Sequence, residues 1–227
     1  MADHPLDRPV WSSLSTRQRP LAQGGAQALM YAPDYALFAA AIDRSPAALE
    51  ALSALVPREG QVALVEAEPA PAVPRTVAVS SATLCQMVAE AITPAAEPDF
   101  AITPLGEADA PQMLALATLT KPGPFFARTH QLGDFVGVKQ DGRLLAMAGE
   151  RMKPDGYTEV SGVCTDPEHR GRGYAGALMR VVAGRILARG ETPFLHTYAH
   201  NTGAIGLYQT LGFVVRREMT MTVLQRA

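Results

Sequence analysis

The chain has 227 residues, of which 48% are hydrophobic and 19% charged, and its formal net charge is −2. This composition predicts a globular protein with a full core rather than a disordered chain, and the charge indicates neither a nucleic-acid nor a membrane partner. The two cysteines lack metal-ligand neighbours, the apolar runs are too short to span a bilayer, and the N-terminus does not resemble a signal peptide. We therefore expect a cytoplasmic protein without a disulfide framework or a metal site.

Residues 1–98 are expected to form a small α/β unit that begins with an irregular segment over 1–20. The clearest signal is Ser45-Pro46, an N-cap followed by proline at the first helical position. The expected elements are a helix over 21–30, a strand or helix over 35–41, a helix over 47–56, strands over 61–66 and 76–80, and a helix from Ser81 or Thr83 to Ile92. The proline-rich segment 93–98 is the best candidate for a domain boundary.

Residues 99–227 are expected to form a second unit, in which basic side chains outnumber acidic ones. Asp141-Gly142 predicts a hairpin turn, and Gly190 and Gly212 each follow a predicted helix. The expected strands cover 100–103, 135–140, 143–152, 157–165, 194–199 and 213–224. The expected helices cover 105–119, 125–131, 202–211 and a segment that follows Ala175 and ends near 188.

The segment between the strand 157–165 and the next helix has the composition of an anion site. It contains two glycines and two arginines, and it leads directly into a helix N-terminus, where backbone N–H groups and the helix dipole favour negative charge. The alternative is an ordinary strand–helix turn with two solvated arginines. A P-loop is excluded by sequence, and the spacing of Gly171, Gly173 and Gly176 makes only a weak dinucleotide fingerprint because the expected ribose-binding acid is not evident.

Arg170-Gly171-Arg172-Gly173-Tyr174-Ala175 resembles the acyl-CoA loop of the GNAT superfamily of N-acyltransferases. A second element, from Asn201 through Ala204 and Tyr208 to Gly212-Phe213, resembles the C-terminal element of that family at matching spacing. The resemblance covers roughly residues 100–224. It implies an α/β fold with a mixed, mostly antiparallel twisted sheet flanked by helices, here with a smaller N-terminal α/β unit.

The resemblance also implies an acetyl-CoA-dependent N-acetyltransferase that needs no metal. Residues Arg170 to Ala175 would hold the pyrophosphate, and the backbone from Val163 through Cys164 to Thr165 would pair with the pantetheine arm, assisted by Asn201. Tyr208 would act as general acid toward the leaving thiolate, and Glu159 as general base.

Each of these roles has an alternative. Asn201 and Tyr208 share a helix face, and without the resemblance an N-cap and a core-facing tyrosine are the favoured interpretation. Glu159 is as compatible with a solvated carboxylate or a pair with Arg151, and Glu150 is its rival as base. Cys164 is interpreted as a core residue because no histidine is placed to activate it. His196 and His200 are expected to be structural or exposed.

The acceptor is expected to be a small amine or an amino acid, bound near the helical pieces that follow residue 100 and the loop 131–134, with the N-terminal unit as a further candidate. Arg128 is a candidate for binding a carboxylate on it. Direct transfer within a ternary complex is expected because no activated nucleophile is evident. A non-catalytic acyl-CoA sensor and a nucleotide-binding module are the alternatives. Residues 1–98 could be a degenerate acyltransferase half, a lid or an assembly surface, and a homodimer is possible.

Overall fold

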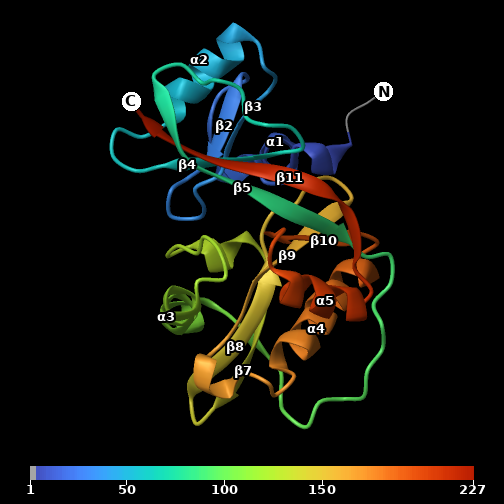
Figure 1. Ribbon diagram of the computed structural model, residues 1–227. Helices are drawn as coiled ribbons and strands as arrows, with labels where there is room; N and C mark the ends of the chain where they lie inside the picture. The colour runs from blue at the N-terminus through green and yellow to red at the C-terminus, as the bar shows by residue number, and fades with distance from the viewer. Residues whose placement is uncertain (1–3) are drawn as a thin grey trace.

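The computed structural model describes residues 4–227, which form a three-stranded and an eight-stranded sheet with associated helices (Figure 1). The larger sheet has the strand order β4-β11-β5-β10-β9-β8-β7-β6. Its neighbouring strands are antiparallel, except that β9 and β10 are parallel. This mixed, mostly antiparallel sheet flanked by helices confirms the predicted fold class.

The small sheet contains β1 (Ala22–Gly24), β2 (Ala28–Tyr31) and β3 (Ala39–Ala41). The large sheet contains β4 (Val62–Glu66), β5 (Thr76–Val88), β6 (Thr103–Leu105), β7 (Phe135–Gln140), β8 (Arg143–Glu150), β9 (Tyr157–Thr165), β10 (Thr192–Tyr198) and β11 (Val214–Arg226). The α-helices are α1 (Pro9–Ser15), α2 (Pro46–Leu55), α3 (Ala110–Thr120), α4 (Tyr174–Ala188) and α5 (Thr202–Thr210). The short 3-10 helices are η1 (Pro5–Asp7), η2 (Arg19–Leu21), η3 (Glu107–Asp109), η4 (Thr129–Leu132) and η5 (Pro167–His169).

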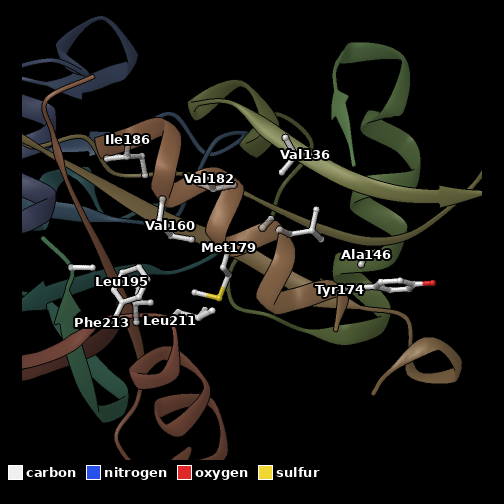
Figure 2. Packing of buried hydrophobic residues seen from close by; sticks show 14 of the residues in the cluster. Val136, Ala146, Val160, Tyr174, Met179, Val182, Ile186, Leu195, Leu211 and Phe213 are labelled. Carbon is white, nitrogen blue, oxygen red and sulfur yellow. The ribbon is translucent and has the colours of Figure 1, made fainter. Parts of the chain in front are cut away.

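Helices α3 and α4 cover opposite faces of the β7–β9 part of the large sheet. Side chains alternate along a strand, so Val136 of β7 belongs to the cluster around α4 while its neighbour Phe135 belongs to the cluster around α3. Met179, Val182 and Ile186 recur along α4 at helical spacing and pack against the sheet (Figure 2). With both faces covered, this part of the sheet is rigid enough to hold a site at its edge.

Several predicted elements are confirmed, and their local signals explain them. The Ser45 hydroxyl caps α2 by accepting a hydrogen bond from the backbone N–H of Ala48, and Pro46 occupies the first turn. The β7–β8 hairpin turns at Asp141 and Gly142, whose φ angles of 51° and 77° suit a type I′ turn. Strand β9 has its predicted bounds, and the observed α4, α5, β10 and β11 agree with prediction to within about two residues.

The helix predicted to begin at Ser81 or Thr83 is wrong. Residues 76–88 instead form one long strand, β5, which pairs with β11 along its whole length and with β10 over Leu84–Val88. Alanine, leucine and glutamine in this segment favour a helix locally, but the pairing with two neighbouring strands overrides that weak preference. A serine or threonine that is expected to cap a helix is equally compatible with a strand.

The helix predicted over 21–30 is also wrong, because β1 and β2 form a hairpin there. The missed signal is the pair Gly24-Gly25, since Gly24 has a φ of 111° that other residues adopt rarely. The segment 35–41 was predicted as a strand or a helix, and its residues 39–41 form a strand. Residues 5–15 of the predicted irregular segment are mainly helical, and the piece predicted as helix over 125–131 is a loop followed by η4.

Strands from both sides of the proline-rich segment 93–98 belong to the large sheet. β4 and β5 precede this segment, and their partners β10 and β11 follow it. In Figure 1 the long β5 and β11 run from the part that contains β1–β3 to the part that contains α4 and α5. A functional division into 1–98 and 99–227 stays a prediction, but the hydrogen bonding of the sheet is continuous across it. No helix among residues 4–227 is long and apolar enough to cross a membrane.

Candidate active site

The two parallel strands of the large sheet separate after a short paired stretch. β10 pairs with β9 only from Thr192 to Phe194, opposite Tyr157 to Glu159. Beyond these residues β10 follows β5 and β9 follows β8, where a register shift between Met147 and Gly149 accompanies a φ of 64° at Gly162. The backbone of β9 from Val160 onward therefore has no partner on the β10 side, and the sheet opens at the carboxyl ends of both strands.

A cavity of about 440 Å³, which we call the loop cavity, lies at the end of β9. Every residue that was predicted to bind a cofactor lines it: Val163, Cys164, Thr165, Arg170, Gly171, Arg172, Gly173, Tyr174, Ala175 and Asn201. Tyr208, the predicted acid, lines it as well, whereas Glu159 does not. The structure thus brings together the predicted site residues except the predicted base.

The loop that closes this cavity presents free hydrogen-bond donors. Gly171 and Gly173 have φ angles of 77° and 79°, and Gly173 is the N-cap of α4. Within residues 4–227 no acceptor is placed for the backbone N–H of Gly171, Arg172 or Gly173, and neither Arg170 nor Arg172 joins an ion pair. Unpartnered N–H groups, a helix N-terminus and two free guanidinium groups suit a pyrophosphate.

Tyr174 lines the loop cavity and is also packed into the core. Its side chain is 8% exposed and packs edge-on against Phe100, with 4.7 Å between the ring centroids. This contact anchors the first turn of α4 in the core. The helix N-terminus that faces the cavity is therefore fixed by packing rather than by a side-chain cap.

Asn201 and Tyr208 occupy the first and last turns of α5. The Asn201 side chain accepts a hydrogen bond of 3.2 Å from the backbone N–H of Ala204, so the predicted N-cap is confirmed. The ring of Tyr208 lies 6.4 Å from that of Phe213, and no described residue hydrogen-bonds its hydroxyl. Burial raises the pKa of Tyr208 above its usual value, which keeps the phenol protonated at neutral pH.

A second cavity, of about 210 Å³, meets the loop cavity at four residues: Pro122, Val163, Asn201 and Tyr208. Its other walls come from distant parts of the chain. Phe38, Val65 and Leu84 belong to the first 98 residues, and Lys121, Arg151 and His196 to the remainder. Residues 1–98 therefore contribute directly to the candidate site.

Glu159 lies beneath the second cavity in a buried hydrogen-bond network. Arg151 donates to its two carboxylate oxygens from Nε and Nη2, both at 2.8 Å, and the Nδ1 of His196 lies 2.8 Å from Oε1. Burial alone would raise the pKa of Glu159, but the charge and hydrogen bonds of Arg151, with a further bond from His196, hold it far below its usual range. Such a carboxylate is a weak base, so these surroundings favour the alternative of an Arg151 pair.

The His196 ring is held between Gln86 and Glu159. The Oε1 of Gln86 accepts a hydrogen bond from Arg216, so its Nε2 donates to the Leu6 carbonyl and to the Nε2 of His196. His196 Nδ1–H then donates to Glu159. Both ring nitrogens of His196 are therefore engaged within the protein.

Three further predicted candidates, Glu150, Arg128 and His200, line neither cavity. Glu150, the rival base, is 1% exposed and pairs with Lys153 and Arg189, each at 2.7 Å. Arg128 donates to Gln131 and stacks on Tyr35, so it lines neither cavity. His200 stacks on Tyr198 at the surface.

Cys164 has the properties of a core residue. It is 7% exposed, and burial raises the pKa of its thiol to about 11. A thiol with this pKa is almost fully protonated at neutral pH and is a poor nucleophile. Its surroundings therefore agree with the interpretation of Cys164 as packing rather than chemistry.

Comparison with known proteins identifies the arrangement. A family model described as FR47-like protein matches residues 135–222. The crystal structure of a GNAT-family protein from Novosphingobium aromaticivorans is 47% identical, covers 99% of this chain and 100% of its own, and has a TM-score of 0.92. A GCN5-related N-acetyltransferase from Kribbella flavida is 22% identical, with coverage of 96% and 94% and a TM-score of 0.65, and shows a shared fold. No curated protein matches the chain significantly.

Proposed function

Because the chain belongs to the GNAT family of acyl-CoA-dependent N-acyltransferases, we propose that it transfers an acetyl group from acetyl-CoA to a small primary amine. The observation that carries this proposal is the meeting of two cavities at Tyr208. The loop cavity has the donors for a pyrophosphate, and the second cavity opens onto the same phenol from the other side. Donor and acceptor can thus meet in one ternary complex.

The loop cavity fits acetyl-CoA as a cosubstrate. The N–H groups of Gly171 to Gly173, with Arg170 and Arg172, would bind the pyrophosphate. The backbone of β9 from Val163 to Thr165, which lacks a β10 partner, would pair with the pantetheine amides as an added strand does. One of its N–H groups would polarise the thioester carbonyl.

Tyr208 is the proposed general acid. Attack by the amine nitrogen forms the new C–N bond, the C–S bond breaks, and the thiolate takes a proton as it leaves. Tyr208 lines both cavities, no residue of the range 4–227 hydrogen-bonds its hydroxyl, and the phenol remains protonated at neutral pH, so it can supply that proton.

The proton that the amine loses needs a route other than Glu159. A small cavity of about 50 Å³ between β9 and β10 is lined by Ser161, Arg151, His196 and Tyr208. This volume has room for water with polar partners, so we assign the proton to solvent that enters there. Glu159 is assigned a positioning role, because it fixes the orientation of Arg151 and His196 on the cavity wall.

The test is acetyl-CoA-dependent thiol release with a panel of primary amines. We expect amine-dependent release by the wild type and a fall in kcat of about 10²-fold or more for Tyr208→Phe, with the affinity for acetyl-CoA unchanged. Tyr157→Phe is the matched control, because the Tyr157 hydroxyl bonds to His4 away from the cavities. Binding of acetyl-CoA without release for any amine would instead support the sensor alternative.

A further inference from the structure

Arg151 presents an unused edge of its guanidinium group to the second cavity. Nε and Nη2 donate to Glu159, but within residues 4–227 no acceptor is placed for Nη1. A Cβ built on Gly123 would lie 3.9 Å from Nη1, so this nitrogen faces the loop 121–124 that lines the same cavity. The guanidinium group also makes a cation–π contact with Phe38, in which Cζ of Arg151 lies 4.9 Å from the centroid of the Phe38 ring. Arg151 is thus a rigid donor with free N–H groups.

The charged residues that line the second cavity are both cations. They are Arg151 and Lys121, and among residues 4–227 no aspartate or glutamate lines it. Of the lysines in the described chain, Lys139 and Lys153 form ion pairs and Lys121 forms none. Glu159 pairs with Arg151, so the charge of Lys121 is left in excess at this cavity. The charge complements an anionic group on the occupant.

The other walls of the second cavity are mainly apolar. Phe38, Val65, Leu84, Met152 and Met221 supply them. The volume of about 210 Å³ lies below the roughly 300–1,000 Å³ of pockets for drug-sized ligands. The occupant is therefore a small molecule with one anionic group and a short apolar part.

We propose that the acceptor is an α-amino acid with an apolar side chain, an inference that rests on the acyltransferase function proposed above. Its carboxylate binds Nη1 of Arg151 and the ammonium of Lys121, and its side chain lies against Phe38, Val65 and Leu84. Arg151 and Tyr208 also both line the small cavity of about 50 Å³ between β9 and β10. A carboxylate bound to Arg151 and an amine that reacts beside Tyr208 are therefore separated by a few bonds. That separation suits an α-amino acid.

The two cations also favour the reactive form of the acceptor. A positive charge near an amine disfavours its protonation, and only the neutral amine attacks a carbonyl. The carboxylate of an amino acid offsets the repulsion that an isolated ammonium would meet on entering the cavity. An amine without a carboxylate therefore enters less well than the matching amino acid.

The test measures thiol release with saturating acetyl-CoA for matched pairs of acceptors. Each pair is an amino acid and its decarboxylated amine: L-leucine with 3-methylbutylamine, and L-phenylalanine with 2-phenylethylamine. Spermidine and a peptide with a free N-terminus complete the panel. We expect kcat/KM to be on the order of tenfold or more higher for the amino acid of each pair, since charge-assisted hydrogen bonds are the strong ones.

Variants separate recognition of the carboxylate from general damage. Lys121→Met is expected to raise KM for the amino acids several-fold and to lower KM for the decarboxylated amines, because it removes a positive charge that attracts a carboxylate and repels an ammonium. Lys139→Met is the matched control, because Lys139 pairs with Asp109 away from the cavity. Arg151→Lys keeps the positive charge but loses the planar guanidinium group that can donate two hydrogen bonds to a carboxylate. This variant should therefore lower the preference for the amino acid over its decarboxylated amine.

Three outcomes have distinct meanings. Absence of thiol release with every amine contradicts the proposed function itself. Release with the decarboxylated amines equal to or above that with the amino acids, or release only with spermidine or the peptide, overturns the amino-acid proposal and leaves the acyltransferase intact. An equal effect of Lys121→Met on both members of each pair overturns the carboxylate contact.

Discussion

The two cavities that meet at Tyr208 are built in different ways. The loop cavity is lined mainly by one continuous stretch, from the end of β9 through the first turn of α4, and by α5. The second cavity takes its walls from β4, β5, β9, β10 and β11 and from the connections around Phe38, Lys121 and Arg151. The first depends on local backbone geometry, which a short motif encodes. The second depends on tertiary packing, which no short motif encodes.

The largest expected effect tests the packing that supports the second cavity. Arg151→Met leaves the buried carboxylate of Glu159 without its cation, and we expect a loss of about 3–5 kcal/mol in the free energy of unfolding. The double variant Arg151→Met/Glu159→Leu removes both charges and should recover part of that loss. Denaturant unfolding measures both, and equal losses for the single and double variants would contradict the buried pair.

A second prediction concerns the separation of the two cavities. Leu84→Ala should cost about 2 kcal/mol or more of stability and raise the KM for the acceptor, while the Kd for acetyl-CoA stays unchanged. Leu52→Ala, in α2 and 1% exposed, should cost a similar stability without affecting either constant. A change in the Kd for acetyl-CoA in Leu84→Ala would contradict this prediction, because it would show that the two cavities are coupled.

A third prediction uses pH. The pKa of Glu159 is lowered in the folded protein, so its contribution to stability is present above the unfolded value of about 4.5 and is lost as the pH falls toward the folded value. The stability difference between wild type and Glu159→Gln should therefore be constant near neutral pH and shrink below about pH 4.5. Unfolding measured as a function of pH checks this, and a difference that grows on acidification would refute it.

The smallest effect is expected at Cys164. Because its pKa is raised to about 11 and it is buried, Cys164→Ala should change kcat by less than about twofold. Cys85→Ala is the control, since Cys85 is also a buried free cysteine. A large loss of kcat specific to Cys164→Ala, with a trapped acyl-thiol, would show a covalent route instead of direct transfer.

The extent to which sequence predicted the site follows from this contrast. The residues from Val163 to Ala175 are neighbours in the chain, and the resemblance of this stretch to the GNAT acyl-CoA loop was enough to place them at one cavity. Asn201 and Tyr208 were placed by a second motif on a single helix. Phe38, Val65 and Leu84 are ordinary apolar residues, and only the pairing of β4 and β5 with β11 and β10 brings them to the site.

The same contrast explains the errors in the predicted fold. The pair of Glu159 with Arg151 was one of the alternatives in the sequence, but the choice stayed open because a contact between neighbouring strands depends on their register. The segment 81–92 was predicted as helix from local preference, whereas β5 is fixed by strands more than a hundred residues away. Elements with strong local signals, such as α2 and the Asp141-Gly142 turn, were predicted correctly because capping and turn geometry need few long-range contacts.

The most direct test of the central claim is a calorimetric titration of acetyl-CoA into wild type, Gly173→Val and Gly184→Ala. Gly173 has a φ of 79°, which valine adopts only with strain, and it holds the loop N–H groups toward the cavity. Gly184 lies within α4 with open space around it, so alanine fits there. We predict binding by wild type and Gly184→Ala, and a Kd on the order of tenfold or more weaker for Gly173→Val. Equal binding by all three proteins would contradict the assignment of acetyl-CoA to the loop cavity.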